Sequence, residues 1–470
     1  MSDDISIQAL RGAFDGRLIA DAVEMGPFLT DWRGHYRGQA LAVVQPDTAA
    51  DVAKVVAWCA EHRVAITPQG GNTGLAGGSV PAPDGRNIVL SLARLNRVRA
   101  VDPANGTITV EAGVPLAAVQ AVAAAAGRLF PLSLASEGSC TIGGNLATNA
   151  GGVAVLRYGN ARELCLGLEV VTPQGALWDG LRGLRKNNTG YDLRDLYVGS
   201  EGTLGVITAA VMKLYPLPAA RLVALAAVPT PQAAVALLQL AQARLDAGLT
   251  AFELISQPCL DLVLKHRAGA RAPYAGASPW HVLIELSAPL DEAQGRAALE
   301  GLLQAALDKG LAVDAVVSAS LAQADALWTL REGISEAQSA EGASIKHDIA
   351  VPISRIADFI EAGQRALLAI SPSARPMTFG HLGDGNLHFN VSAPAGADKA
   401  AFMALQPAMN LAIHDLVAAY DGSISAEHGL GLLRRDEAIR YRSPLETQLM
   451  RTLKTALDPE NLMNPGKVLP

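Results

Sequence analysis

Two glycine-rich loops constrain this chain more than any other feature of its sequence. The first, PQGGNTGLAGG at 68–78, places five glycines within nine positions after a short apolar run, Val64–Thr67. Glycine lets the backbone come close to a ligand, and successive N–H groups can form a nest for an anion. The second, GSCTIGGNLATNAGG at 138–152, can meet the same anion from another side. Two such loops in one expected α+β unit predict a diphosphate-binding site rather than two plain surface turns.

The spacing of these glycines excludes the two commonest nucleotide-binding motifs. Neither GxGxxG nor GxxxxGK[ST] is present in the loops.

The rest of the chain shows a pattern of helices and strands. The expected helix 49–62 has Val52, Val55, Val56 and Cys59 on one face. Around Pro216 and Pro218 the pattern changes to strands such as 222–228 and 281–286, which alternate with helices such as 232–247 and 292–309. A chain of 470 residues is too long for one core, so a second, antiparallel α+β domain is expected there.

Charge, hydropathy and cysteine spacing exclude several classes of protein. The net charge is −7 without a cluster of Lys and Arg, which argues against nucleic-acid binding. No apolar run reaches about 18 residues, and the acidic start lacks a signal peptide, so a cytoplasmic protein without a membrane span is expected. The four cysteines are far apart, which excludes an iron–sulfur or zinc-knuckle motif and predicts free buried thiols.

A candidate metal site lies in the segment FGHLGDGNLHFN at 379–390. Asp-Gly between strand-like residues is a strong two-residue hairpin signal. If Asp384 and Gly385 form the turn, His381 opposes His388 with β-carbons about 5 Å apart, which suits two ligands of one metal. Asn390 would share that face. A slipped turn would separate the pair, so the geometry is a hypothesis.

The adjacent pair Glu427-His428 offers a third ligand and a base. Neighbouring residues of an extended segment point to opposite sides, so Glu427 can bind a metal while His428 faces elsewhere. Gly429 and Gly431 leave room for a ligand. Spacing alone is equally compatible with histidines that serve only the structure.

Four motifs together carry a resemblance to a known family. PQGGNTGLAGGSVP (68–81), GSCTIGGNLATNAGG (138–152), RYGN (157–160) and RKNNTGYDLRDLYVGSEGTLGVIT (185–208) closely resemble the vanillyl-alcohol oxidase/p-cresol methylhydroxylase flavoproteins. Within them, the D-2-hydroxyglutarate and D-lactate dehydrogenase group is most similar. The resemblance implies an α+β protein: an FAD-binding domain of two α+β subdomains at 1–217 (core about 37–217), a substrate domain at 218–420 with a mainly antiparallel sheet covered by helices, and a segment, 421–470, that returns to the flavin and metal site.

The resemblance also implies which residues bind the cofactor. The first loop would hold the FAD diphosphate, and Asn72 and its neighbours offer no nucleophile for a covalent link, so non-covalent FAD is expected. The implied contacts are Pro68, Gln69, Gly70, Gly71, Asn72, Thr73, Gly74, Gly78, Ser79, Leu134, Gly138, Ser139, Ile142, Gly143, Gly144, Asn145, Thr148, Gly151, Gly152, Glu201, Gly202, Ile207 and Asn464.

By the same resemblance, His381, His388 and Glu427 would bind Zn²⁺ or Mn²⁺, and His428 would be the general base. Two histidines and one carboxylate suit either ion. The implied reaction is oxidation of a D-2-hydroxy acid, with hydride transfer to flavin N5 and activation of the hydroxyl by the metal.

Substrate-binding positions are implied for Arg331, Ser335, Lys346 and Asn390. Arg331 and Ser335 have i, i+4 spacing on an expected helix. Because the metal would hold the C1 carboxylate, Arg331, Ser335 and Lys346 favour a second, distal carboxylate, as in D-2-hydroxyglutarate. D-lactate or glycolate dehydrogenase, an oxygen-using oxidase and, more remotely, a flavin-binding subunit without catalysis are the alternatives. Electrons would leave to an electron-transfer flavoprotein, a quinone or a cytochrome, and the resemblance suggests a homodimer.

Overall fold

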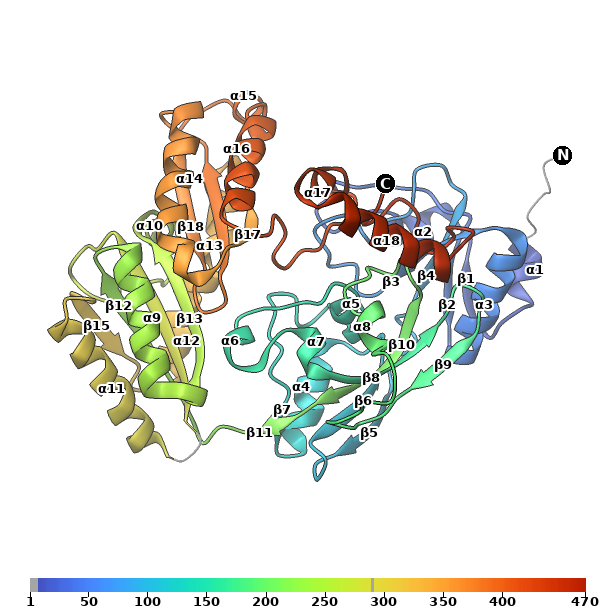
Figure 1. Ribbon diagram of the computed structural model, residues 1–470, viewed down its shortest axis with the longest axis horizontal. Coiled ribbons are helices and arrows are strands. Elements are labelled where there is room, and N and C mark those ends of the chain that lie inside the picture. Colours follow the sequence, from blue (N-terminus) through green and yellow to red (C-terminus); the bar gives the residue numbers. More distant parts are fainter. Residues whose placement is uncertain (1–6, 289–290) are drawn as a thin grey trace. The chain divides into compact units, whose positions relative to one another are not determined.

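The structure, a computed structural model, describes residues 7–288 and 291–470. It divides into two compact units, which are coloured along the chain in Figure 1. Unit 1 comprises the described residues of Met1–Gly152 together with Gly159–Leu217 and Glu427–Pro470. Unit 2 comprises Val153–Tyr158 and Pro218–Ala426. Each unit is therefore built from segments that are separated in the sequence.

The first sheet of unit 1 has four strands. Strands β2, β4 and β3 are parallel and β1 is antiparallel, in the order β1 (Gly16–Ile19), β2 (Ala42–Pro46), β4 (Asn87–Ser91), β3 (Ala65–Gln69). Helix α3 (Ala49–His62) begins at Thr48, whose hydroxyl accepts the N–H of Asp51. Its face of Val52, Val55, Val56 and Cys59 is fully buried, as predicted.

The second sheet of unit 1 has five strands and is antiparallel throughout. Its order is β5 (Val98–Asp102), β6 (Thr107–Glu111), β10 (Val206–Lys213), β8 (Cys165–Val171), β9 (Leu177–Gly180). The remaining elements of residues 7–217 in unit 1 are short: α1 (Ile7–Arg11), α2 (Ala22–Leu29), α4 (Leu116–Ala125), β7 (Arg128–Leu129), α5 (Ile142–Ala147), α7 (Ala161–Leu164), α8 (Arg194–Tyr197) and β11 (Tyr215–Pro216).

The segment 427–470 completes unit 1. It carries α17 (Arg435–Tyr441) and α18 (Pro444–Leu457), and Met463 then forms a parallel bridge with Ile66 of β3. The N–H of Ile66 donates to Leu462, and the N–H of Asn464 donates to Ile66. These bonds place the segment beside the strand that leads into the first glycine loop.

Unit 2 is built on one antiparallel sheet. The order is β15 (Asp314–Val317), β12 (Ala220–Val228), β14 (Trp280–Ala288), β13 (Leu249–Ser256), β18 (Arg375–His381), β19 (Asn386–Ser392), β16 (Ser344–Ile345), and β17 (Asp348–Ala350) also pairs with β19. Nearly continuous apolar strands such as β12 require cover on both faces.

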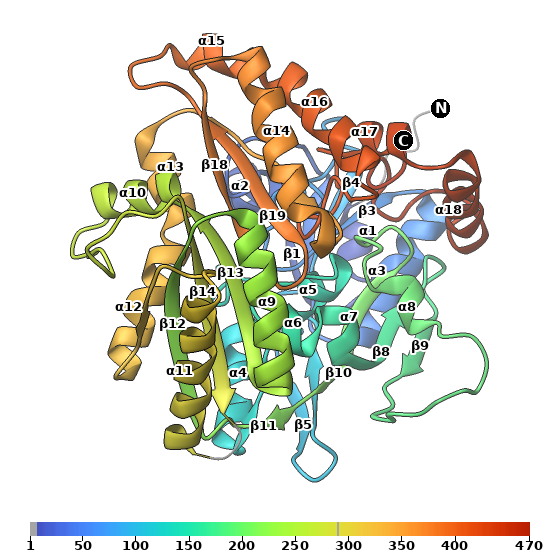
Figure 2. The same cartoon turned by 60° about the vertical axis from the view of Figure 1, so that its left-hand side comes forward.

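Helices cover both faces of this sheet. One face packs against α10 (Gln257–His266), α12 (Leu321–Glu332) and α13 (Ile334–Glu341), with Trp328 and Phe379 in a shared core. Figure 2 shows the opposite face under α9 (Pro231–Leu245), α11 (Glu292–Asp308) and α14 (Ile356–Ile370). On that face the ring of Phe359 lies 5.3 Å from the ring of Phe389. The other elements are α6 (Val155–Tyr158), α15 (Lys399–Met403) and α16 (Gln406–Ala419).

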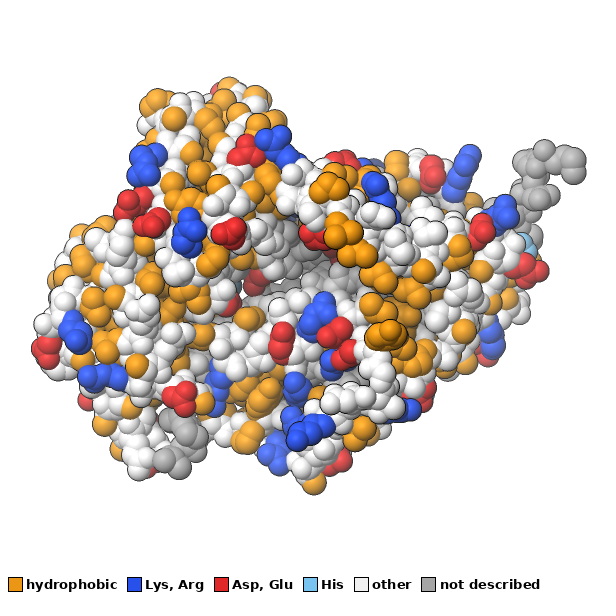
Figure 3. Space-filling view, viewed as in Figure 1, with side chains coloured by type: hydrophobic (Ala, Val, Ile, Leu, Met, Phe, Trp, Pro, Cys, Tyr) orange, Lys and Arg blue, Asp and Glu red, His pale blue; other side chains and the backbone are white. Residues whose placement is uncertain are grey.

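These sheets confirm the predicted α+β class, with two α+β subdomains in unit 1 and an antiparallel, helix-covered sheet in unit 2. The four cysteines are free and buried, as expected. Within residues 7–288 and 291–470, no helix is long and apolar enough to span a bilayer. On the face shown in Figure 3, basic side chains are interspersed with acidic ones over each unit.

Candidate active site

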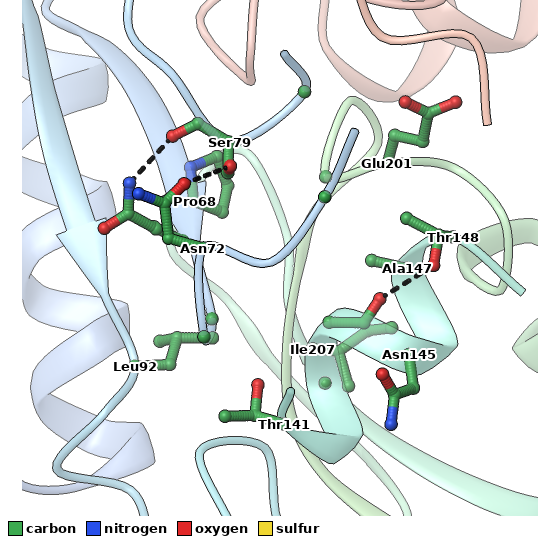
Figure 4. A pocket seen from close by; sticks show the side chains of 18 of the residues that line it. Pro68, Asn72, Ser79, Leu92, Thr141, Asn145, Ala147, Thr148, Glu201 and Ile207 are labelled. Carbon is green, nitrogen blue, oxygen red and sulfur yellow. Dashed lines mark hydrogen bonds between the residues drawn. The ribbon is translucent and has the colours of Figure 1, made fainter. Parts of the chain in front are cut away.

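A cavity in unit 1 is lined by three of the four family-like motifs. It is bordered by the loop after β3, by helix α5 with the turn before it, and by the segment that leads into β10. Figure 4 shows side chains from these three segments around it, with Asn145 on α5, Thr148 directly after that helix and Ile207 on β10. Because β3 and β10 belong to different sheets, the cavity lies where the two subdomains of unit 1 meet.

The two glycine loops approach each other so closely that side chains are excluded. A β-carbon added to Gly71 would lie 2.0 Å from the carbonyl oxygen of Ser139, and one added to Gly70 would lie 2.5 Å from the Thr141 hydroxyl. Asn72 has a left-handed backbone, with φ of 53°. Its side-chain oxygen accepts a 2.7 Å hydrogen bond from the hydroxyl of Ser79. Glycine is therefore needed at positions 70 and 71 for contact between the loops.

Most of the predicted cofactor contacts line this cavity. Those that do are Pro68, Gln69, Gly70, Gly71, Asn72, Thr73, Gly74, Gly78, Ser79, Gly143, Gly144, Asn145, Thr148, Glu201, Gly202 and Ile207. Seven others do not line it: Leu134, Gly138, Ser139, Ile142, Gly151, Gly152 and Asn464. Contact with the cofactor stays a prediction for the residues of both groups.

Thr141 also lines the cavity, within the second glycine loop that was expected to meet the anion. Sequence reasoning did not name six further lining residues: Ala76, Leu92, Ala147, Ser200, Gly205 and Val206. All of these except Leu92 lie inside the recognised motifs, so choosing whole motifs instead of single residues would have included them. Leu92 has no such signal. It follows β4, and its N–H donates to Gln69 at the end of β3, so only the pairing of these strands brings it to the cavity.

His428 lines the same cavity, on a segment that Glu201 holds in place. One carboxylate oxygen of Glu201 accepts the N–H of Leu430 and the other accepts the N–H of Gly431, both at 2.8 Å. A β-carbon on Gly431 would lie 2.2 Å from the carbonyl oxygen of Ala76 in the first glycine loop. Burial raises the pKa of the Glu201 carboxyl, while the two N–H donors act in the opposite direction.

Gly152 and Asn464 make further hydrogen bonds around this segment within unit 1. The N–H of Gly152 donates to the Glu427 carboxylate at 3.0 Å. The side-chain amide of Asn464 donates to the carbonyl oxygens of Gly78 and Glu201, each at 2.9 Å. Asn464 therefore ties the first glycine loop to the residue that holds the His428 segment.

The histidine hairpin forms in unit 2, but with a register that differs from the prediction. His381 pairs with Asn386, and His388 pairs with Phe379, so the expected pairing of His381 with His388 is wrong. Residues 382–385 make a four-residue connection in which the N–H groups of Asp384 and Gly385 both donate to the carbonyl oxygen of His381. A shift of two residues keeps the same face. The two imidazoles are therefore diagonal neighbours, with ring centroids 5.8 Å apart.

Each histidine has a carboxylate beside it that sequence reasoning did not single out. Glu253 of β13 pairs with His381 across the strands, and its Oε1 lies 2.8 Å from His381 Nδ1. Asp348 of β17 pairs with His388, with Oδ1 3.9 Å from His388 Nδ1. Burial alone would raise the pKa of Glu253, but the neighbouring His381 and Arg331 bring it down to about 2. Only the pairing of distant strands reveals these contacts.

The predicted substrate-binding residues have different surroundings. Arg331 is buried at the end of α12, whereas Ser335 on α13 is exposed, so the expected single helical face is wrong. The helix is interrupted at Gly333, where an added β-carbon would lie 3.3 Å from Val263 of α10. Lys346 is half-buried between β16 and β17.

Asn390 lies on the His388 face of β19, as predicted. Its side-chain oxygen accepts the N–H of His347, and its side-chain nitrogen donates to Gln338 of α13 at 2.9 Å. The amide therefore joins the sheet to α13, and contact with substrate stays a prediction.

Comparison with known proteins agrees with this arrangement. Residues 217–468 match the family model "FAD linked oxidases, C-terminal domain", and residues 40–180 match an FAD binding domain. The chain belongs to the FAD-linked oxidase family. This family member is 41% identical over 452 residues to a D-2-hydroxyglutarate dehydrogenase of Xanthomonas citri pv. viticola, which covers 96% of this chain and 94% of the relative. It is 40% identical over 471 residues to the mitochondrial D-2-hydroxyglutarate dehydrogenase of Bos taurus, which covers 100% of this chain and 84% of the relative.

Solved structures support the fold of this FAD-linked oxidase. A p-cresol methylhydroxylase superposes with a TM-score of 0.76 over 98% of this chain and 95% of the other, at 15% identity. An alkyldihydroxyacetonephosphate synthase gives a TM-score of 0.73 over 98% and 84%, at 17% identity. The enzyme is an FAD-dependent oxidoreductase of this fold. The lining of the cavity suits FAD, because residues of both glycine-rich loops form part of its wall and successive backbone N–H groups of such loops can bind a diphosphate.

Proposed function

We propose that this enzyme oxidises D-2-hydroxyglutarate to 2-oxoglutarate. The observation that carries the proposal is the similarity of nearly the whole chain to proteins named D-2-hydroxyglutarate dehydrogenase, at 36–41% identity. The bound FAD would supply the acceptor for the hydride that leaves C2 of the substrate. The chain's own residues have three tasks: they take the hydroxyl proton, hold the hydroxyl with its adjacent carboxylate, and recognise the rest of the molecule.

His428 is proposed as the base. The support is its place at the wall of the flavin cavity and the firm seating of its segment by Glu201. Neutral imidazole is a weak base, and histidine is the side chain that most often takes up a proton in catalysis. A base of this strength needs a hydroxyl that has become more acidic than a free alcohol.

His381, His388 and Glu427 are proposed as ligands of one divalent cation, Zn²⁺ or Mn²⁺. When bound, the cation would act as a Lewis acid on the substrate hydroxyl and C1 carboxylate. The two imidazoles are held together within unit 2, and Glu427 is anchored within unit 1 by the Gly152 N–H. The chemistry of the donors fits such an ion, because imidazole and carboxylate suit both zinc and manganese.

Arg331 is proposed to bind the distal carboxylate, together with Ser335 and Lys346. Arg331 is only 7% exposed, and its Nη2 has no hydrogen-bond partner in the described part of the chain. A buried guanidinium nitrogen is costly unless an acceptor satisfies it, and a carboxylate is the best match to its geometry. This favours a dicarboxylate over D-lactate or glycolate.

The proposal is tested by adding substrate to the oxidised enzyme without oxygen. D-2-Hydroxyglutarate should bleach the flavin absorbance, and D-lactate and glycolate should do so with a kcat/KM at least about tenfold lower, the discrimination expected from one paired charge. Dialysis against a chelator should abolish turnover without removing FAD, and Zn²⁺ or Mn²⁺ should restore it. A faster reaction with D-lactate, or full activity without metal, would refute the corresponding part.

A further inference from the structure

Glu253 occupies an unusual position for a charged residue. It lies in the middle of the sheet of unit 2, on strand β13, and is 1% exposed. It pairs with His381 on the neighbouring strand, so both side chains project from the same face. That face is covered by α12 and α13, which bring Arg331 to the same place.

One carboxylate of Glu253 serves two partners. Its Oε1 lies 2.8 Å from Nδ1 of His381, and its Oε2 accepts the Nε–H of Arg331, also at 2.8 Å. An ionised carboxylate only accepts hydrogen bonds, so Nδ1 of His381 carries a proton and Nε2 carries the lone pair that a metal needs. A carboxylate behind a ligating imidazole is known to fix its tautomer and orientation.

The same carboxylate fixes the guanidinium. Its bond to Nε leaves Nη2 as the buried donor without a partner among the described residues. Phe379 supports the plane from another side, with its ring 4.9 Å from the Arg331 guanidinium carbon. The ring of Phe379 is also 4.8 Å from that of His388.

We propose that Glu253 is a positioning residue that couples metal binding to recognition of the distal carboxylate of the substrate. The proposal rests on the function proposed above. A single side chain orients the imidazole of His381 toward a cation and the guanidinium of Arg331 toward an anion. Loss of the carboxylate should therefore weaken metal binding and dicarboxylate selectivity together.

Glu285 provides a matched control. It lies on the adjacent strand β14 and is also buried, and its Oε2 accepts the Nε–H of Arg221 and the indole N–H of Trp328, both at 2.7 Å. Both glutamates thus lie buried in the same sheet and each accepts a hydrogen bond from an arginine. Of the two, only Glu253 is also bonded to a histidine. A purely structural role predicts the same behaviour for Glu253→Gln and Glu285→Gln.

The experiment compares these two variants of the FAD-loaded enzyme with wild type. Zn²⁺ affinity is measured by competition with a chromophoric chelator, without turnover. At saturating Zn²⁺, KM is measured for D-2-hydroxyglutarate and for D-lactate. Glu253→Gln should weaken Zn²⁺ binding by about 10- to 100-fold. It should also raise KM for D-2-hydroxyglutarate at least about tenfold, the effect of one misplaced charge-assisted bond, with little change for D-lactate.

A second variant covers the case in which Glu253→Gln does not fold because it leaves Arg331 without a counter-charge. The double variant Glu253→Gln/Arg331→Met removes both charges, a change that buried pairs often tolerate. It should still bind Zn²⁺ more weakly than Arg331→Met alone, because only the double variant lacks the carboxylate behind His381.

Wild-type Zn²⁺ affinity and selectivity in Glu253→Gln would overturn the proposal. Equal changes in Glu253→Gln and Glu285→Gln, or equal Zn²⁺ affinity in the double variant and Arg331→Met, would overturn it too. Failure of the proposed function itself is recognised separately, because wild-type enzyme would then lack metal dependence or activity on D-2-hydroxyglutarate.

Discussion

Replacing Glu201 by glutamine should loosen the segment that carries His428. The carboxylate accepts two N–H groups, from Leu430 and Gly431, at 2.8 Å each. A glutamine side chain has one oxygen, so it can keep one of these bonds but presents an NH₂ group to the other donor. A hydrogen bond to a charged group contributes about 1.5–3 kcal/mol, so the attachment of the His428 segment to Glu201 should be weaker by roughly 2 kcal/mol. Such a change in free energy corresponds to about a 30-fold rise in the population in which the segment is detached from Glu201.

Amide hydrogen exchange measures that population directly. Peptides that span 428–433 should exchange roughly 30-fold faster in Glu201→Gln, in line with the lost stability of the seated segment. If His428 is the base, kcat should fall by the fraction of enzyme molecules in which the segment is detached from Glu201, and hydrogen exchange gives that fraction.

Glu163→Gln is the matched control for this change. The Glu163 side chain accepts a single backbone N–H, that of Asn160 at 3.0 Å, at the start of α7. Glutamine keeps such a capping bond, so exchange at 428–433 should not change. Wild-type protection of this segment in Glu201→Gln, or equal loss in both variants, would refute the role assigned to Glu201.

Two further predictions concern stability. Gly71→Ala should lower the free energy of unfolding by about 1–3 kcal/mol, because its β-carbon would lie 2.0 Å from the Ser139 oxygen. Gly74→Ala is the control, since its β-carbon would meet no atom within 4 Å. Denaturant unfolding of the apoprotein should show the difference between the two variants, and equal stability would contradict the loop contact. Burial lowers the pKa of His281, which bonds to Tyr274, from 6.5 to about 4. The unfolded state then binds more protons, so stability should be lost as pH falls from about 6.5 to 4, by roughly 3 kcal/mol at most. His281→Asn should show a flatter pH dependence of unfolding, and an identical slope would contradict this assignment.

The parts of the fold that follow local rules could be predicted from the sequence. Helix α3 has the expected bounds and buried face, since a capped amphipathic helix is specified by neighbouring residues. The glycine loops were recognisable from their density of glycines, and at Gly71 the Ser139 backbone comes so close that no side chain fits. The motifs also contain most of the residues that line the cavity of unit 1.

The histidine hairpin shows where local rules end. Asp384-Gly385 predicts a two-residue turn, but the N–H of Gly383 donates to Phe252 of β13, and Gly383 packs against Leu156. These contacts come from distant parts of the chain and set the longer connection. The error was two residues, an even number, so both histidines kept the predicted face.

Glu253 could not be found from the sequence for a related reason. Its partners are identified only by the register of β13 with β18, which places His381 beside it, and by the packing of α12, which carries Arg331. Likewise, helical spacing alone placed Ser335 with Arg331, because it could not show that α12 ends at Glu332 and that α13 begins at Ile334.

The route of the chain has a consequence for biosynthesis. Unit 1 is interrupted by the whole of unit 2, and its last contacts are made by Met463 with β3, by Asn464 with Gly78 and by Lys467 with Val80. During translation, unit 1 therefore lacks residues 427–470, which include His428 of the cavity wall, while about two hundred residues of unit 2 emerge. The bridge between Met463 and β3 can then form only after unit 2 has been synthesised, so the first sheet of unit 1 lacks this contact while unit 2 emerges.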